Sequence, residues 1–142
     1  MRPQLLVVLL FAASLPALDL KTVAAERDPV KRARMALDNG EQAATNAGKA
    51  CKAGDYDPCN DELTETKDSV ELAADSLQKT GINPSRNPRH FKDAEIRTRK
   101  ILRILHAVEP YIHPEDADRY RSIVRRVSDI NDRLLSAIMK RK

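Results

Sequence analysis

The chain has 142 residues, with 25 Lys and Arg against 21 Asp and Glu and a formal net charge of +4. This length fits one domain with a single hydrophobic core and excludes a multidomain protein. Only 4% of the residues are aromatic and 32% are charged, which is typical of helical bundles and unlike sheet proteins, whose strands favour β-branched and aromatic residues.

The N-terminal segment has the pattern of an export signal. A short basic lead, Met1 to Gln4, precedes an apolar run over residues 5–13 that is too short to span a bilayer comfortably. Pro16 interrupts the run, and small residues ending at Ala25 suit cleavage by signal peptidase. We expect residues 1–25 to be a signal peptide and residues 26–142 to be the exported domain, with an uncleaved interfacial anchor as the alternative.

The first helix is expected over residues 29–53. Asp28 is a good N-cap, and Pro29 occupies the first helical position, where its missing N–H has no intrahelical partner to lose. Gly54 then ends the helix.

Two cysteines, Cys51 and Cys59, enclose the turn that follows this helix. An oxidising compartment favours pairing of two thiols only eight positions apart, and the intervening residues have the composition of a helix-helix connection. We predict a disulfide at the tip of a helical hairpin. A redox-active pair is the alternative, although such pairs usually have Cys-x-x-Cys spacing.

Three more helices are delimited by proline and glycine. Proline follows a polar or capping residue at Asp57-Pro58, Asn87-Pro88 and His113-Pro114, and a helix is expected to begin at each of these pairs. Gly81 marks the end of the first of these three helices, and Pro110 marks the end of the second. The predicted helices are therefore 58–80, 88–109 and 114–139.

Each predicted helix carries an apolar stripe with steps of three and four residues, the seam of helices packed at shallow angles. The stripes are Val30, Ala33, Leu37, Gly40, Ala44, Ala47 and Cys51; Cys59, Leu63, Thr66, Val70, Ala73 and Leu77; Phe91, Ala94, Thr98, Ile101, Leu105 and Val108; and Ala117, Tyr120, Val124, Val127, Asn131, Leu134 and Ile138. Similar helix lengths and short links predict an all-α, up-down-up-down four-helix bundle built from two helical hairpins.

Asn131 is the one amide on these stripes. A buried amide on a seam can set helix register or oligomeric state at a cost in stability, while a partly exposed helix position is the simpler alternative.

Charge is divided unevenly between the two predicted hairpins. Residues 26–82 hold 8 Lys and Arg against 12 Asp and Glu, a net charge of −4, whereas residues 83–142 hold 15 against 8, a net charge of +7. This asymmetry fits attraction between the halves, head-to-tail association of copies, or a basic face for an acidic partner.

A basic interaction face is the candidate functional site. Its predicted members are Arg97, Arg99, Lys100, Arg103, Arg125 and Arg126. Such a face could contact an envelope protein or an anionic surface, and the alternative is a solvated helix face with local ion pairs. Nucleic acid is not an expected partner, because export removes the usual target and the basic segments lack interleaved aromatic residues.

No cofactor, metal or catalytic site is predicted. The histidines His90, His106 and His113 lack the Glu-x-x-His spacing of di-metal bundles, and no haem attachment motif is present. The sequence also has no nucleophile elbow or phosphate-binding loop. The link over residues 81–90, with two Asn-Pro pairs and two arginines, could receive an anion at a helix N-terminus, or it is simply a rigid connector.

The turn Gly54-Asp55-Tyr56 resembles the turn between the two helices of a tetratricopeptide repeat, but these helices are longer and no second copy follows. A longer part of the chain looks like small secreted bacterial helical proteins without an established activity. This part comprises the turn, Ser76-Leu77, Thr80-Gly81-Ile82-Asn83-Pro84, Pro88-Arg89-His90-Phe91-Lys92 and the helix with Leu134-Leu135. This resemblance implies an exported helical bundle and no particular activity.

These observations together predict a non-enzymatic exported protein of the periplasm or the cell exterior. We expect a protein-interaction or structural module of the cell envelope. A homo-oligomer of this chain is compatible with the prediction. The alternatives are a periplasmic chaperone or stress protein that holds unfolded clients, which requires an exposed apolar concave surface, and a helical repeat adaptor built from two hairpins.

Overall fold

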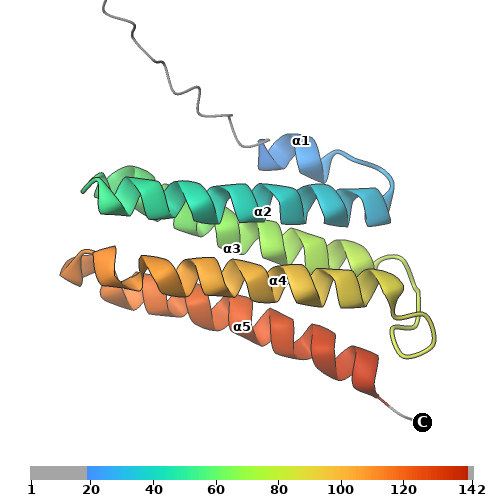
Figure 1. The fold of residues 1–142 in the computed structure, drawn as a ribbon. Coiled ribbons are helices and arrows are strands. Elements are labelled where there is room, and N and C mark those ends of the chain that lie inside the picture. The colour runs from blue at the N-terminus through green and yellow to red at the C-terminus, as the bar shows by residue number, and fades with distance from the viewer. Residues whose placement is uncertain (1–18, 141–142) are drawn as a thin grey trace, which may run out of the picture.

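Four long helices dominate the fold, which we describe from a computed structural model covering residues 19–140. In chain order they are α2 (Pro29–Lys52), α3 (Tyr56–Gln78), α4 (Arg89–Val108) and α5 (Ala117–Met139). A short helix, α1 (Leu20–Ala24), precedes them, and two 3-10 helices, η1 (Glu109–Tyr111) and η2 (Pro114–Asp116), join α4 to α5 (Figure 1). No strand forms within residues 19–140, so the predicted all-α fold class is confirmed.

Local signals in the sequence explain where the helices begin and end. One carboxylate oxygen of Asp28 accepts hydrogen bonds from the backbone N–H groups of Val30, at 2.9 Å, and Lys31, at 3.2 Å. Gly54 and Gly81 have φ angles of +78° and +69°, which side chains disfavour. Helix α3 begins at Tyr56, two residues earlier than predicted, because Pro58 is tolerated within the first turn, where N–H groups have no intrahelical acceptor.

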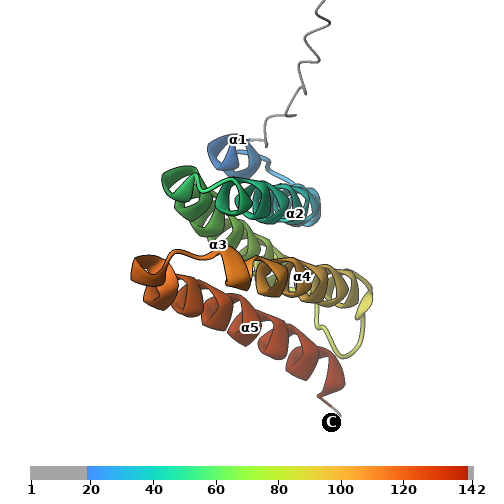
Figure 2. The same ribbon diagram turned by 60° about the vertical axis from the view of Figure 1, so that its left-hand side comes forward.

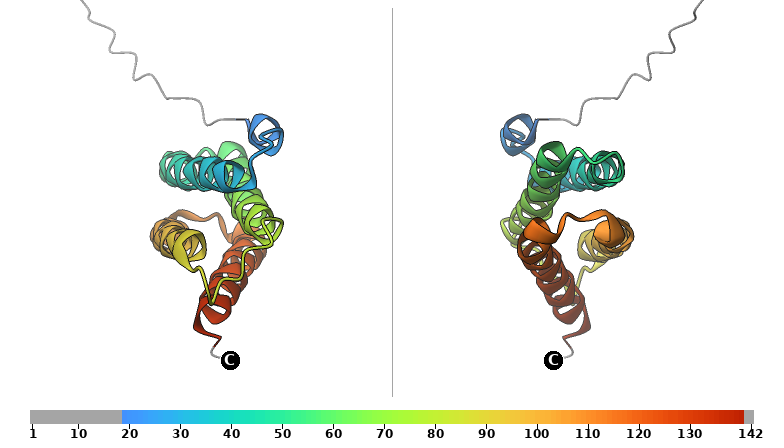
Figure 3. Two further views of the ribbon diagram at one scale, coloured as in Figure 1. Left: turned by 90° about the vertical axis from the view of Figure 1, so that its right-hand side faces the viewer. Right: turned by 90° about the vertical axis from the view of Figure 1, so that its left-hand side faces the viewer.

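The four long helices occupy the corners of a square in the order α2, α3, α5, α4 (Figures 2 and 3). Helix α2 packs along α3 and α4, and α5 packs along α4 and α3. Helices α3 and α4 lie on a diagonal and have few contacts, although the link over residues 79–88 joins them. The helices alternate in direction along the chain (Figure 1), but their packing order differs from that of a bundle in which every helix packs against the next one.

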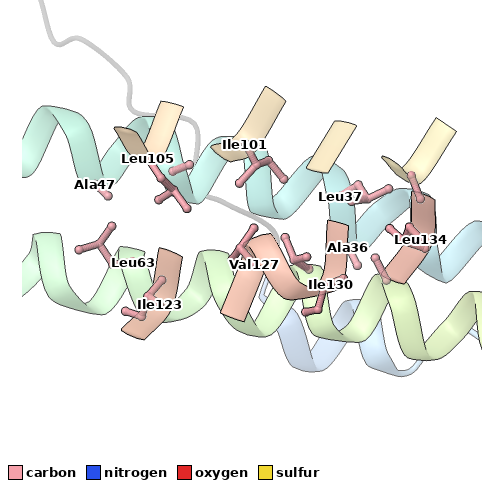
Figure 4. Close-up of a cluster of buried hydrophobic side chains, with 14 of the residues drawn as sticks. Ala36, Leu37, Ala47, Leu63, Ile101, Leu105, Ile123, Val127, Ile130 and Leu134 are labelled. Atoms are coloured by element: carbon pink, nitrogen blue, oxygen red, sulfur yellow. The ribbon is translucent and has the colours of Figure 1, made fainter. Parts of the chain in front are cut away.

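Apolar side chains from all four long helices meet between them (Figure 4). The stripes predicted for α3 and α4 are buried along their whole length, whereas Val30, Ala117, Val124 and Ile138 at the predicted stripes of α2 and α5 are only partly buried. Helix α2 buries a second line of small residues, including Ala36 and Ala43, because it contacts α3 on one side and α4 on the other.

Polar side chains also take part in helix packing. The side-chain amide of Asn39 donates to Oε1 of Glu65 and to Oγ of Ser69, each at 2.8 Å, across the α2–α3 interface. Asn131 is buried on the seam of α5, and its amide donates to the backbone carbonyl of Glu95 on α4 at 2.9 Å. The simpler expectation of a partly exposed Asn131 is therefore wrong, since the close approach of α4 provides the amide with an acceptor.

Cys51 and Cys59 form a disulfide, as predicted, with Cα atoms 5.2 Å apart. Two aromatic contacts extend this end of the bundle to the α4–α5 connection. The rings of Tyr56 and His113 meet edge to face with centroids 4.8 Å apart, and the Lys52 ammonium lies 5.2 Å from the ring centroid of Tyr111. The disulfide end of the bundle is thus held across both hairpins.

Helix α1 lies within the segment that the sequence assigns to the export signal. The side chain of Asp19 caps it by accepting a hydrogen bond from the backbone N–H of Lys21 at 3.2 Å, and Val23 is completely buried against the core. The apolar run over residues 5–13 and Pro16 lie outside the described residues.

Candidate functional site

Interhelical ion pairs take up much of the predicted basic face. Arg97 on α4 pairs with Asp38 and with Glu41 of α2, the latter at 3.1 Å from its Nε atom. Lys100 approaches the other carboxylate oxygen of Glu41 at 3.0 Å. Glu41 is therefore held between two cations of the opposite hairpin.

The surroundings of Glu41 and Arg97 change the pKa values of these two side chains. Partial burial by itself would raise the pKa of Glu41, but hydrogen bonds from Lys100 and Arg97 outweigh this effect and lower the pKa. Burial would likewise lower the pKa of Arg97, yet its hydrogen bonds to Asp38 and Glu41 raise it. The ionised forms of Glu41 and Arg97 therefore stabilise each other in the folded chain.

A second contact of this kind joins α5 to α3. The guanidinium of Arg126 pairs with the carboxylate of Glu71, and Arg119 donates to Oγ1 of Thr64 at 2.9 Å. Both contacts run from the basic hairpin to the acidic one. At these contacts, side chains of the basic hairpin bind side chains of the acidic hairpin of the same chain.

The remaining predicted members of the basic face are placed differently. Arg99 pairs with Glu95 one turn earlier on α4, at 3.0 Å. Arg103 and Arg125 are exposed and have no ion pair within residues 19–140. Since Arg97 and Lys100 face α2 while Arg126 faces α3, the six side chains do not gather into one surface.

An open groove lies between α3 and α5 at the end of the bundle opposite the disulfide. Its volume is about 350 Å³. Its apolar lining comes from both helices, from the α3–α4 link and from the start of α4, and consists of Ala74, Ile82, Pro84, Phe91, Ile130, Leu134 and Ala137. The link over residues 81–90, for which the sequence predicts a rigid connector or an anion site, therefore supplies one wall of an apolar groove.

Four charged residues and one glutamine form the rim of this groove. Glu71, Asp75 and Gln78 lie on the α3 side, and Arg126 and Arg133 lie on the α5 side. The Arg126–Glu71 pair bridges the two helices and closes one end of the groove. A bound segment would thus meet an apolar floor between an acidic edge and a basic edge.

Among the described residues, the other polar groups form no second candidate site with a clear chemistry. Burial raises the pKa of Glu62, while a hydrogen bond from Asn46 counteracts part of this effect, and one carboxylate oxygen of Glu62 is buried without a partner. A hollow at the start of α4 has a volume of about 340 Å³ and is lined by Arg34, Arg89, His90 and Asp93. Binding of an anion near this helix start stays a prediction.

Residues 19–140 contain no group of three or more histidine, cysteine, aspartate or glutamate side chains that could hold a metal ion. His90 lies in the first turn of α4, and His113 lies beyond the other end of this helix, which has 20 residues and hence a length of about 30 Å. Over the same described range, no helix is long and apolar enough to cross a membrane.

Searches against known protein families, curated proteins and solved structures found no match to this chain. The groove therefore has to be interpreted from its own geometry.

Sequence reasoning did not find the groove. Ile130 and Ala74 lie beside the predicted stripes of their helices, and Ile82 lies in a link. A helical stripe predicts which residues face a neighbouring helix and does not predict where a groove is left between two helices. The apolar isoleucine in an otherwise polar link was the only local signal.

Proposed function

We propose that this chain is a non-enzymatic, exported protein-interaction module of the cell envelope and that the groove between α3 and α5 is its binding surface. The observation that carries the proposal is an apolar groove with charged edges on an otherwise ion-paired helical bundle. Export is supported by the N-terminal sequence pattern and by the Cys51–Cys59 disulfide, which is typical of oxidising compartments.

The dimensions of the groove suit a peptide segment. Its lining residues on α5 extend from Arg126 to Ala137, which corresponds to about 16 Å of helix at 1.5 Å per residue. An amphipathic segment can place its apolar side chains on such a floor and its polar side chains at the edges, as in helix-in-groove recognition. An envelope protein that exposes such a segment is the expected partner.

We include no reaction in the proposal. The titratable side chains of the groove are Glu71, Asp75, Arg126 and Arg133, and none of these types is paired there as a nucleophile with a base. Their chemistry favours ionic contacts with a bound chain.

The same groove also favours a second candidate function, that of a periplasmic chaperone holding unfolded clients. A chaperone of this kind needs an exposed apolar concave surface, and the groove is one. Selectivity separates the two functions, because an interaction module has one dominant partner and a holding chaperone has many unrelated clients.

The proposal is tested by cross-linked capture from the native envelope fraction under non-reducing conditions, using the full chain. Ala137→Arg places a long charged side chain in the partly buried floor of the groove, and Ser136→Arg is its control on the exposed side of the same helix. We expect one dominant partner that Ala137→Arg loses and Ser136→Arg retains. Many unrelated clients would favour the chaperone, and equal capture by both variants would exclude the groove as the binding surface.

A further inference from the structure

Helix α1 is joined to the folded domain by several independent contacts. Val23 has no exposed surface and belongs to the same apolar cluster as the residues between the long helices, and Leu20 packs against that cluster. Helix α1 lies against α2 and α3 (Figures 1 and 3). It therefore covers apolar surface that water would reach in its absence.

The turn that follows α1 is also fixed to α2. The backbone carbonyl of Glu26 accepts a hydrogen bond from the Arg32 guanidinium at 2.7 Å. The side-chain carboxylate of Glu26 lies 3.0 Å from the Lys31 ammonium. The same carboxylate accepts the backbone N–H of Asp28 at 3.1 Å. These bonds fix the turn between α1 and α2, and this turn places α1 against the core.

Cleavage after Ala25 would remove this helix. The product would lose Leu20 and Val23 together and would place a charged N-terminal ammonium on Glu26, beside the contacts that orient the turn. A signal peptide has to be removable without damage to the mature fold. Removal of a helix with a completely buried valine would instead leave a gap in the core.

We propose that α1 is part of the mature protein and that the export signal is cut before Asp19, not after Ala25. The inference rests on the export proposed above. The sequence offers small residues for such a cut, since Ala12, Ala13, Ser14 and Ala17 all precede α1. Asp19, which caps the helix, then lies at or close to the mature N-terminus.

The position of the cut is tested on the full-length precursor with a C-terminal affinity tag, produced in a bacterium with a general secretion pathway. The product is fractionated, and its N-terminus is read by intact mass and terminal sequencing. A second precursor carries Ala25→Gln, which removes the small residue required next to a cut after position 25 and alters only an exposed side chain.

We expect both precursors to yield an exported product that begins at or before Asp19, with masses that differ only by the substitution. A wild-type product that begins at Glu26, together with blocked processing of Ala25→Gln, would overturn the inference while leaving export intact. An unprocessed chain would also overturn it, and its location would show whether the export proposal fails as well.

The contribution of α1 to the fold is measured separately on the purified product. Val23→Ala removes buried methyl groups and keeps a small residue at this position, while Thr22→Ala changes an exposed neighbour in the same helix. We expect Val23→Ala to lower Tm by roughly 5 °C and Thr22→Ala to leave it nearly unchanged. Equal melting of the two variants would contradict a place for α1 in the mature core.

Discussion

Gly40 shows at the scale of one residue why α2 is rich in small side chains. A Cβ atom at this position would lie 3.2 Å from Cδ1 of Ile101 on α4 and 3.3 Å from Cβ of Ser69 on α3. Helix α2 can therefore approach both neighbours closely only because this side chain is absent. Glycine costs a helix about 1 kcal/mol relative to alanine, and overpacking costs roughly 1–3 kcal/mol, so the two effects oppose each other here.

This opposition predicts coupling between Gly40 and Ile101. We compare the change in the free energy of unfolding that Gly40→Ala causes in two backgrounds. We expect this change to be less favourable to stability in the wild-type chain than in Ile101→Val, by about 0.5–1 kcal/mol, because valine lacks the crowded Cδ1 atom. Urea unfolding of the four proteins of the cycle measures the difference. Gly48→Ala is the control, since a Cβ there would crowd only Val108, at 3.3 Å. A cycle at Gly40 without coupling would show that Ile101 does not restrict this site.

Other single residues mark the limit of prediction from sequence. The disulfide between Cys51 and Cys59 follows from their spacing and is present. The burial of Asn39, which no predicted stripe included, depends on Glu65 and Ser69 being brought opposite it on α3. Sequence spacing shows which side of a helix a residue occupies but not which polar partner the next helix presents.

At the scale of helices, Arg97 connects the acidic hairpin to the basic one. Its side chain is largely buried at the α2–α4 interface, with 20% of its surface exposed, and it contacts two carboxylates of α2. A partly buried, multiply hydrogen-bonded guanidinium of this kind contributes more to stability than a fully solvated surface pair.

Arg97→Gln is therefore expected to lower the free energy of unfolding at pH 7 by about 1 kcal/mol, an amount already reduced for solvent screening. The pKa of Glu41 is lowered in the folded chain, so its contribution is present above the unfolded pKa of about 4.3 and is lost as the pH falls through the lower folded pKa. The difference between Arg97→Gln and wild type should thus shrink as the pH falls from 7 to 3.

The measurement is urea unfolding at several pH values. Arg103→Gln is the matched control, because Arg103 lies on the same helix, is exposed and forms no ion pair among the described residues. A loss of stability in Arg97→Gln that is the same at pH 7 and pH 3 would mean that burial of the alkyl chain, not charge pairing, is what Arg97 contributes.

At the scale of the whole molecule, the two ends of the bundle differ. The disulfide and the Tyr56–His113 and Lys52–Tyr111 contacts close one end across both hairpins. At the other end, the groove opens between α3 and α5, and the long link lines one side of it. The cross-linked end holds the helices in a rigid arrangement, and the other end presents the proposed binding surface.

Loss of the disulfide is expected to lower the free energy of unfolding by roughly 2–3 kcal/mol, because a short closed loop restricts the unfolded chain. Replacing Cys51 and Cys59 together by alanine should produce the same unfolding midpoint as wild type in a reducing agent. The reducing agent should have no effect on the double variant, which serves as the control. An unchanged wild-type midpoint on reduction would show that the bridge adds no stability.

The sequence by itself determined the helical class, the approximate helix ends, the disulfide and most of the core positions. These features depend on local signals, such as Pro29 after Asp28, the glycines at positions 54 and 81, and the regular spacing of apolar residues. Only the tertiary structure decided that α3 and α4 lie on a diagonal, that the basic residues on α4 and α5 face different partners, and that a groove opens beside Ile82 and Ile130. The physical reason is that helix adjacency, charge pairing and the position of a groove depend on how separate helices come together, which local spacing does not encode.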